Sequence, residues 1–291
     1  MRQWVRWTFT VLCSVALGPH LRALADAYTF ATLDFPGATL TIPSGINNRG
    51  EIVGQANTAS GGHGFLYYKG DFRLIDVPGA SFTVAAGIND RSQIVGTYNA
   101  TPASPSQGFL LDRAIFTSID VPGAVSTNAS GINNRGDIVG SYQDTNLVFH
   151  GFLYDGEHFV MIDFPGGSST FASGINDRGD IVGSGGIGVS TSDGFVYDGV
   201  SFASLIFPGA FRNTATGINN PGTIVGSYNT DPVPHPGQAF HGFLFENHRF
   251  ASIDVTGAFS TTALGINERR QIVGEYTEAS GGAEHGFLAS P

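Results

Sequence analysis

The 291-residue chain contains a single cysteine, Cys13, which lies in an apolar leader, so the remainder of the chain has no thiol for a disulfide. Basic residues are scarce too, with 14 Lys and Arg against 24 Asp and Glu. This balance argues against nucleic acid or anionic lipid as a partner, because both attract basic patches. After the leader, no apolar run reaches the roughly 20 residues of a membrane-spanning helix. No segment sustains a 3.6-residue period either, so we expect almost no helix.

The first 25 residues have the features of an export signal. Arg2 and Arg6 provide a positive start, residues 7–18 are an apolar run, and residues 23–25 read Ala-Leu-Ala, a small-x-small cleavage signal. A membrane anchor is the alternative, but the apolar run is too short to span a bilayer. We predict a signal peptide over 1–25, cut after Ala25, and a single domain over 26–291 that is secreted to the cell exterior or the periplasm.

A ten-residue pattern recurs six times in the chain. Each copy reads Gly-Ile-Asn, then four turn residues, then Ile-Val-Gly, and the copies begin at Gly45, Gly87, Gly131, Gly174, Gly217 and Gly265. The steps between copies are 42 to 48 residues long. A fixed period of this size indicates a repeat architecture.

Each repeat contains four short segments with the composition of β-strands. In the third repeat they are 116–120, 127–133, 137–142 and 150–154, rich in β-branched or aromatic residues and bounded by Gly, Pro, Asn or Asp. Four strands in about 40 to 45 residues are typical of a propeller blade. We predict an all-β, six-bladed β-propeller with the Gly-Ile-Asn strand innermost and the Phe-x-x-Ile-Asp strand outermost. An open β-solenoid is the alternative, although its coils are usually much shorter.

The two ends of the predicted domain are complementary. It opens with an outer-type strand at 29–35 and stops on a third-strand sequence at 286–288. Pairing of the two segments in the last blade would close the ring and remove its exposed edges.

The asparagine of each Gly-Ile-Asn precedes a predicted hairpin turn. Asparagine holds such turns through its own side chain, and glycine supplies the positive φ that closes them. Ser92 and Arg270 stand where the turn glycine is expected, so these two turns are predicted to be looser or of another type. A ring of amides near the axis that binds an ion or a sugar is the alternative role for the asparagines.

A second repeated motif makes the chain resemble a known protein family. His-Gly-Phe-Leu occurs at 63–66, 150–153, 241–244 and 285–288. Together with the Gly-Ile-Asn and Ile-Val-Gly pattern, it resembles the bacterial extracellular repeat family named for its His-Ala-Phe motif, over about residues 29–288. Alanine is glycine here in every copy, and Gln107 and Asp193 replace the histidine in two copies. The resemblance implies a secreted, β-propeller-like protein of unknown activity, with no catalytic residues to carry over.

Histidines and aspartates repeat without forming an obvious catalytic or metal site. Because the four histidines fall on different blades, we predict that each bonds a neighbouring backbone group and that no metal is held. Repeated aspartates such as Asp120 and Asp163 are predicted to be caps, too far apart for a glycosidase pair. We expect no cofactor.

The segments between Ile-Val-Gly and Gly-Phe-Leu vary between repeats and should emerge on one face, where binding is normally carried. Tyrosines at their bases either stack on a sugar or peptide or cover the blade edge. Glu275 is the single acid that replaces the uncharged residue of the other copies. The candidate binding residues are Tyr98, Tyr142, Tyr228, Tyr276, His235 and Glu275.

These features favour a secreted, non-enzymatic propeller, expected to be a monomer, whose loop face binds carbohydrate or protein. A hydrolase or lyase acting on extracellular polysaccharide is the first alternative, with Glu275 as its one candidate acid. A structural envelope protein without a ligand is the second.

Overall fold

The computed structural model describes residues 28–187, 191–232 and 238–291. The predicted signal peptide over 1–25, Cys13 and His235 lie outside these residues. The described residues form 24 strands and no helix, which confirms the all-β prediction. None of them belongs to a helix with the length and hydropathy needed to cross a membrane.

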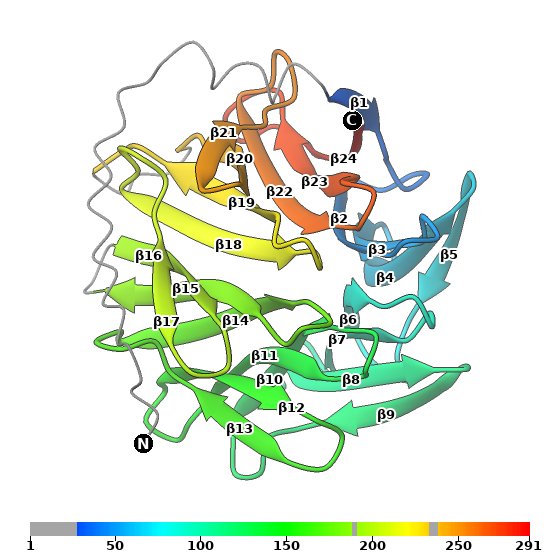
Figure 1. Ribbon diagram of the computed structural model, residues 1–291. Helices are drawn as coiled ribbons and strands as arrows, with labels where there is room; N and C mark the ends of the chain where they lie inside the picture. Colours follow the sequence, from blue (N-terminus) through cyan, green and yellow to red (C-terminus); the bar gives the residue numbers. More distant parts are fainter. Residues whose placement is uncertain (1–27, 188–190, 233–237) are drawn as a thin grey trace, which may run out of the picture.

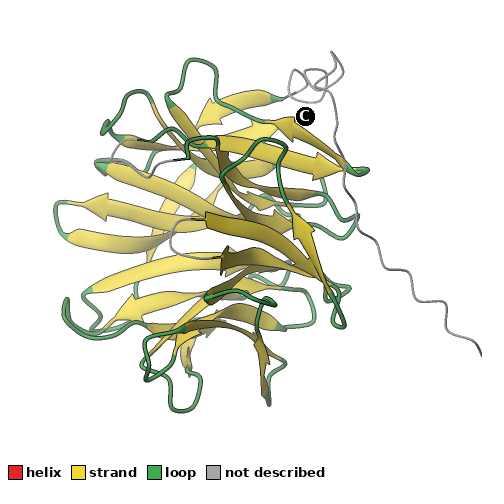
Figure 2. Ribbon diagram, turned by 90° about the vertical axis from the view of Figure 1, so that its left-hand side faces the viewer, coloured by secondary structure: helices red, strands yellow, loops and turns green. Residues whose placement is uncertain are grey.

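The strands form groups of four, called units 1 to 6, which are arranged around a central axis (Figure 1). Figure 2 shows the units as stacked twisted sheets joined by loops. The first strands, nearest the axis, are β2 (Leu40–Ile46), β6 (Phe82–Ile88), β10 (Ser126–Ile132), β14 (Ser169–Ile175), β18 (Arg212–Ile218) and β22 (Ser260–Ile266). The second strands are β3 (Ile52–Thr58), β7 (Ile94–Asn99), β11 (Ile138–Gln143), β15 (Ile181–Ile187), β19 (Ile224–Asn229) and β23 (Ile272–Thr277).

Two further strands complete each unit toward its outer edge. The third strands are β4 (Gly61–Tyr68), β8 (Gln107–Asp112), β12 (Phe149–Tyr154), β16 (Thr191–Tyr197), β20 (His241–Glu246) and β24 (Glu284–Ser290). The outer strands are β5 (Asp71–Ile75), β9 (Ile115–Ile119), β13 (Phe159–Ile162), β17 (Phe202–Leu205), β21 (Arg249–Ser252) and, from the start of the domain, β1 (Thr29–Thr32). All pairings within a unit are antiparallel. Units 3, 4 and 5 are separate four-stranded sheets, whereas single parallel pairs, Leu40 with Glu284 and Gly62 with Phe82, join units 6, 1 and 2 into one 12-stranded sheet.

Strand β1 pairs with β24 near the other end of the chain (Figure 1). The antiparallel register runs from Thr29 opposite Ser290 to Thr32 opposite Phe287. The backbone N–H of Leu33 continues the ladder by donating to the carbonyl oxygen of Gly286 at 2.8 Å. Strand β1 therefore takes the place in unit 6 that the outer strands take in units 1 to 5.

The core of each unit is built around the phenylalanine of Gly-Phe-Leu and the glycine of Ile-Val-Gly. The phenylalanines are Phe65, Phe109, Phe152, Phe195, Phe243 and Phe287, and all have at most 1% of their surface exposed. In unit 3, Gly140 lies directly opposite Phe152 in the β11–β12 ladder. A Cβ added to Gly140 would lie only 2.8 Å from the ring carbon Cε1 of Phe152. The glycine is thus required because the carbonyl oxygen of Asn128 in β10 and the ring of Phe152 leave no room for a side chain.

At the axis, adjacent first strands approach one another through the glycines of Gly-Ile-Asn. A Cβ on Gly131 would lie 3.2 Å from the Cα of Gly174 in the next unit and 2.9 Å from the carbonyl oxygen of Ser173. Every first strand has a register shift just before this glycine, as between Ala129 and Gly131. The close approach leaves no room for a side chain at these positions.

The predicted difference in the turns at Ser92 and Arg270 is wrong. Ser92 has φ 57° and Arg270 has φ 62°, both in the left-handed region that glycine occupies in the other turns. Their backbone N–H groups donate to the carbonyl oxygens of Asn89 and Asn267 at 3.0 Å, as the turn glycines do elsewhere. The asparagine side chains hold the turn in this conformation although it strains a residue with a Cβ.

Replacing Gly140 with alanine is expected to destabilise the protein by about 1 to 3 kcal/mol or more, because the new methyl group overlaps the Phe152 ring and the β10 backbone. Urea unfolding followed by circular dichroism measures the change. Gly156→Ala is the control, since nothing lies within 4 Å of its added Cβ and only the strain of φ 101° is introduced. An equal loss in the two variants would contradict this account of the core.

Candidate functional site

The asparagines of Gly-Ile-Asn link each unit to the next around the axis. Each side-chain Nδ2 donates to the backbone carbonyl oxygen of the next unit's asparagine at 3.0 to 3.2 Å. The series runs from Asn47 through Asn89, Asn133, Asn176 and Asn219 to Asn267, which donates back to Asn47. In unit 1 the Oδ1 of Asn47 accepts from the N–H groups of Arg49 and Glu51 at 3.0 Å. The predicted turn role is confirmed, and each amide has a second role between units.

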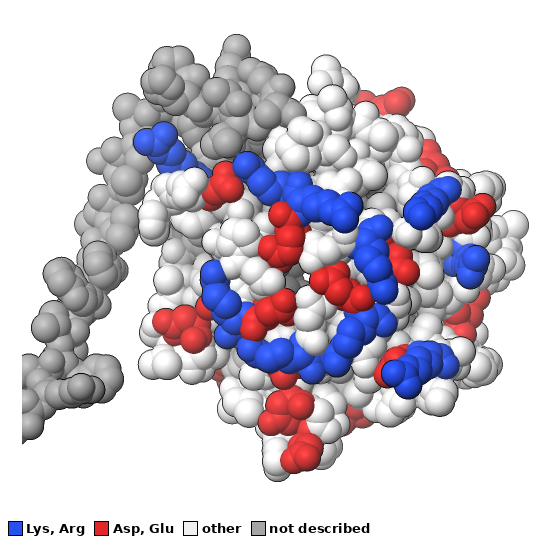
Figure 3. Space-filling view, turned by 45° about the vertical axis from the view of Figure 1, so that its right-hand side comes forward, with Lys and Arg blue, Asp and Glu red and all other residues white. Residues whose placement is uncertain are grey.

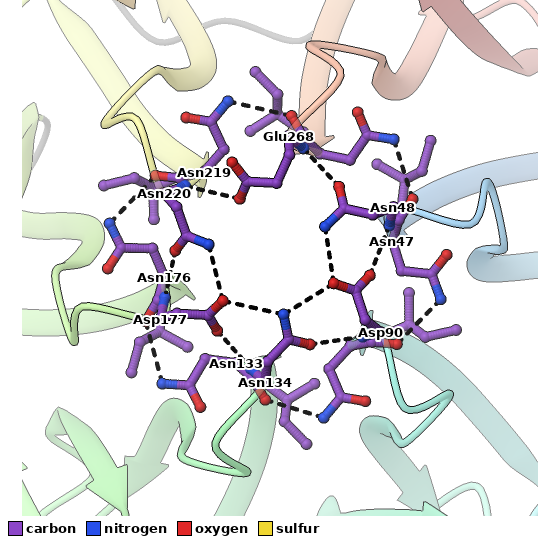
Figure 4. Close-up of a pocket in the computed structure, with 18 residues that line it drawn as sticks. Asn47, Asn48, Asp90, Asn133, Asn134, Asn176, Asp177, Asn219, Asn220 and Glu268 are labelled. Carbon is purple, nitrogen blue, oxygen red and sulfur yellow. Dashed lines mark hydrogen bonds between the residues drawn. The ribbon is translucent and has the colours of Figure 1, made fainter.

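The next residue of each turn forms a second ring, in which amides and acids alternate (Figure 4). Its members are Asn48, Asp90, Asn134, Asp177, Asn220 and Glu268. Each backbone N–H donates to a side-chain oxygen of the next member at 2.7 to 2.9 Å. The Nδ2 of Asn134 also donates to Asp90 and Asp177, at 2.9 and 3.0 Å. Alternation keeps carboxylates apart and gives each amide an acceptor.

Arginines surround these acids on the surface. Figure 3 shows acidic side chains around the central opening and a broken ring of Lys and Arg outside them. Arg135 and Arg178 each bond an acid of their own turn, with Nη2 2.6 Å from Asp137 and 2.7 Å from Asp180. Burial raises the pKa of Asp177, but hydrogen bonds from Asn220 and Asn134 and the charge of Arg135 outweigh it and hold that pKa below its usual value.

The hydrogen bonds of the two axial rings hold neighbouring units together. The opening that they line has a volume of about 80 Å³, enough for a few water molecules. The Nδ2 atoms in both rings donate mainly to other members. Within the described parts of the chain, no three His, Cys, Asp or Glu side chains are placed to hold a metal ion.

The prediction that the repeated histidines bond backbone groups is wrong. Each of the four pairs instead with a repeated aspartate of the adjacent outer segment, with Nδ1 to carboxylate distances of 2.8 to 3.2 Å. The pairs are His63–Asp76, His150–Asp163, His241–Asp254 and His285–Asp34. In unit 4, Asp193 replaces the histidine and Ile206 replaces the aspartate, which avoids two facing acids. This paired substitution was the sequence signal for the contact.

The predicted tyrosines lie beside these pairs. Tyr142, Tyr228 and Tyr276 lie against His150, His241 and His285, with ring centroids 5.2 to 5.3 Å apart. Tyr98 is instead opposite Gln107 in the β7–β8 ladder. Tyr228 is buried under Phe207, with centroids 3.7 Å apart, and its hydroxyl bonds Ser252. Different units thus present these tyrosines to different extents.

Glu275 and Tyr276 both border a pocket between units 5 and 6, called here the loop-face pocket. It has a volume of about 230 Å³. Phe240 and Phe259 supply aromatic lining, and Glu275 and Glu284 supply carboxylates. Tyr276 borders the pocket, but its side chain lies on the opposite face of β23 from Glu275, is buried, and bonds Thr32 through its hydroxyl. Thr262 lies opposite Glu275 in the β22–β23 ladder and forms part of the wall.

The pocket has a local cause in the third residue of the first strand. Unit 4 has Phe171 at this position, and its ring packs on Phe149 of unit 3 with centroids 5.1 Å apart. Unit 6 has Thr262 there, facing Phe240 of unit 5. Unit 5 also has a threonine at this position, Thr214, so the pocket depends on the facing residues of unit 5 as well as on the smaller side chain. The difference between Phe171 and Thr262 is visible when the repeats are compared. Its effect on the pocket depends on the contact with the preceding unit, which the sequence does not show.

Glu275 is unusual among the acids of the described residues. Burial, together with the neighbouring Glu284 carboxylate, raises its pKa from the ordinary 4.5 to about 7. Its Oε2 atom is buried, and no hydrogen-bond partner for it occurs among the described residues. At pH 7 a carboxyl group with this pKa is about half ionised, so inside the pocket it can accept a hydrogen bond or pair with a positive charge.

The chain is similar in fold to solved propeller proteins. The SapL1 lectin in complex with α-methyl fucoside aligns with TM-score 0.58 at 11% identity, covering 87% of this chain and 94% of that chain. A catalytically inactive virginiamycin B lyase from Staphylococcus aureus aligns with TM-score 0.51 at 11% identity, covering 91% and 99%. The β-propeller domain of the Trilobed protease from Pyrococcus furiosus gives 0.54 at 11% identity, covering 90% and 84%.

These likenesses and the arrangement of the sheets define a β-propeller protein. No protein-family model and no curated protein matches the chain. Sequence identity near 11% supports similarity of fold only. The function of the site therefore has to be judged from its own residues.

Glu275→Gln is expected to change how stability depends on pH. Because the folded pKa of Glu275 is raised, the folded state binds a proton more tightly than the unfolded chain. The wild type should therefore lose stability relative to the variant as pH rises from about 4.5 to 7, by up to about 3 kcal/mol. Urea unfolding at several pH values measures this difference. Glu278→Gln, in an exposed loop position, should follow the wild type, and a pH-independent difference for Glu275→Gln would contradict the assignment.

Proposed function

We propose that this chain is a carbohydrate-binding β-propeller whose ligand site is the loop-face pocket. The observation that carries the proposal is the lining of that pocket, in which two aromatic residues, Phe240 and Phe259, accompany two carboxylates. Sugars present apolar C–H faces that stack on aromatic rings and hydroxyl groups that donate to carboxylates. A volume of about 230 Å³ is on the scale of a single pyranose ring.

The neighbours in fold support a binding role. Two of them, the SapL1 lectin and the Aleuria aurantia lectin, are lectins in complex with fucosides. Tyr228 and Tyr276 are both buried with bonded hydroxyl groups, so in this proposal both cover the blade edge. Tyr98, Tyr142 and His235 stay candidates for the same face.

The proposal includes the finer architecture expected from the sequence. The chain is a six-bladed propeller, with units 1 to 6 as its blades and β1 closing the ring on β24. It is a secreted member of the His-Ala-Phe repeat family, with the signal peptide removed near Ala25, and it acts as a monomer. The pairing of β1 with β24 and the bond from Asn267 back to Asn47 support closure.

An enzyme that cleaves extracellular polysaccharide is the second candidate. It is favoured by one observation, the presence of two carboxylates, Glu275 and Glu284, in a single pocket, since glycosidases use such a pair. The virginiamycin B lyase among the fold neighbours shows that this architecture also occurs in an enzyme. Glycan turnover that Glu275→Gln abolishes would replace the binding role with this one.

Deleting residues 1–32, which removes β1, is expected to lower the melting temperature by several degrees and to promote oligomers, because β24 becomes an exposed edge. Differential scanning calorimetry and size-exclusion chromatography measure both effects. Deleting residues 1–27 alone, which keeps β1, is the control. Equal behaviour of the two shortened chains would argue against closure by β1.

Thr262→Phe is expected to abolish carbohydrate binding, because unit 4 shows that a phenylalanine at this position fills the equivalent space. A glycan array followed by isothermal titration calorimetry with α-methyl fucoside and other neutral monosaccharides measures binding. Val84→Phe, the same change at the same position of unit 2, should leave affinity within about twofold. Unchanged binding by Thr262→Phe would place the ligand elsewhere.

A further inference from the structure

The two ends of the units differ in charge. The turn ends are where first strands meet second strands and third strands meet outer strands; the loop ends are opposite. Ten of the eleven Lys and Arg in the described residues lie at or near turn ends, and the eleventh is Arg212, at the loop end of β18. Those ten are Arg49, Lys69, Arg73, Arg91, Arg113, Arg135, Arg178, Arg249, Arg269 and Arg270.

Acids are shared almost equally between the two ends. The loop ends hold eleven: Asp34, Asp76, Asp120, Asp144, Asp163, Asp193, Asp231, Asp254, Glu275, Glu278 and Glu284. Turn-end acids are therefore nearly balanced by basic groups, whereas loop-end acids face one arginine. Arg212 donates from Nη1 to the Oε1 of Gln238, a residue of the pocket wall, at 3.0 Å.

The loop-face pocket concentrates this charge. Glu284 is close enough to raise the pKa of Glu275, and no positive group contributes to that shift. The buried Oε2 of Glu275 has no hydrogen-bond partner among the described residues. Phe259, which is 36% exposed, and Phe240 line the pocket with the two acids. A bound cation would relieve the repulsion between the carboxylates and would also be attracted to the aromatic faces.

We propose that the loop-face pocket selects a sugar that carries a protonated amine, such as a glucosamine unit, with the ammonium group between Glu275 and Glu284 and the sugar ring on the aromatic wall. This inference rests on the proposed carbohydrate-binding function and names its ligand class. The acidic loop ends exclude the opposite class, because uronic acids, sialic acids and sulfated sugars are repelled.

Calorimetric titration of the full chain at pH 7 tests the inference with a matched pair of probes, a glucosamine tetramer and its N-acetylated counterpart, which differ in charge. The amine form should bind about tenfold more tightly or better, since its ammonium meets two partly desolvated carboxylates. Glu275→Gln and Glu284→Gln should each lower affinity for the amine form by about tenfold more than affinity for the N-acetylated form, and so remove most of that preference. Glutamine is already the native residue at the equivalent position of unit 1, Gln55, so the first variant should fold.

The controls separate local recognition from general attraction. Glu278→Gln removes one charge from the same loop without altering the pocket wall, and it should change affinity for the amine form by less than about twofold. A loss equal to that of Glu275→Gln would show that only the overall field acts, and it would overturn the inference. Equal affinities for the two tetramers would also overturn it.

Two results distinguish the inference from the function on which it rests. If neutral and N-acetylated sugars bind as well as the amine form, and Thr262→Phe abolishes all of this binding, the carbohydrate function stands and the amine preference fails. If the sugars do not bind but oligolysine binds in a manner that Thr262→Phe abolishes, the ligand is a basic peptide. The carbohydrate function and the amino-sugar assignment then both fail.

Discussion

The structure depends on the close approach of neighbouring first strands at the axis. Glycines such as Gly131 and Gly174 bring the backbones of two units so close that no Cβ fits between them. This proximity lets the side chain of Asn133 reach the carbonyl oxygen of Asn176. Each bond contributes about 1 kcal/mol, but the bonds hold every unit in one position relative to the next. The gap between units that forms the loop-face pocket has its shape because this spacing is set at the axis.

The axial residues and the loop-face residues meet different requirements. At the axis, donors and acceptors satisfy one another, and the alternation of Asn134 with Asp90 and Asp177 leaves little capacity for a ligand. At the opposite ends the repeat departs from itself, as where Glu275 replaces the uncharged residue of the other units in the pocket wall. Repeated positions therefore hold neighbouring units together, and unequal positions give the loop ends of the units different side chains.

Charge follows the same division. The turn ends combine acids with arginines, as Arg135 does with Asp137, so their surface is electrostatically mixed. The loop ends retain acids and four His–Asp pairs with a single arginine. A surface of this kind discriminates between ligands by their charge before any contact is made. In the proposed binding of an amino sugar, Glu275 and Glu284 add local selection to this general attraction.

Much of this protein was determined by its sequence alone. Regular spacing of Gly-Ile-Asn and Ile-Val-Gly predicts the strands, their order from the axis outward and the turn role of asparagine, because each depends on residues close in the chain. The departure of Glu275 from its repeat is also visible there. Tertiary structure decided what those residues contact. The His–Asp pairs, the amide bonds between units and the positive φ of Ser92 and Arg270 all depend on groups held together by folding. The raised pKa of Glu275 has the same origin, since only the folded chain excludes water from that carboxyl group and places Glu284 beside it.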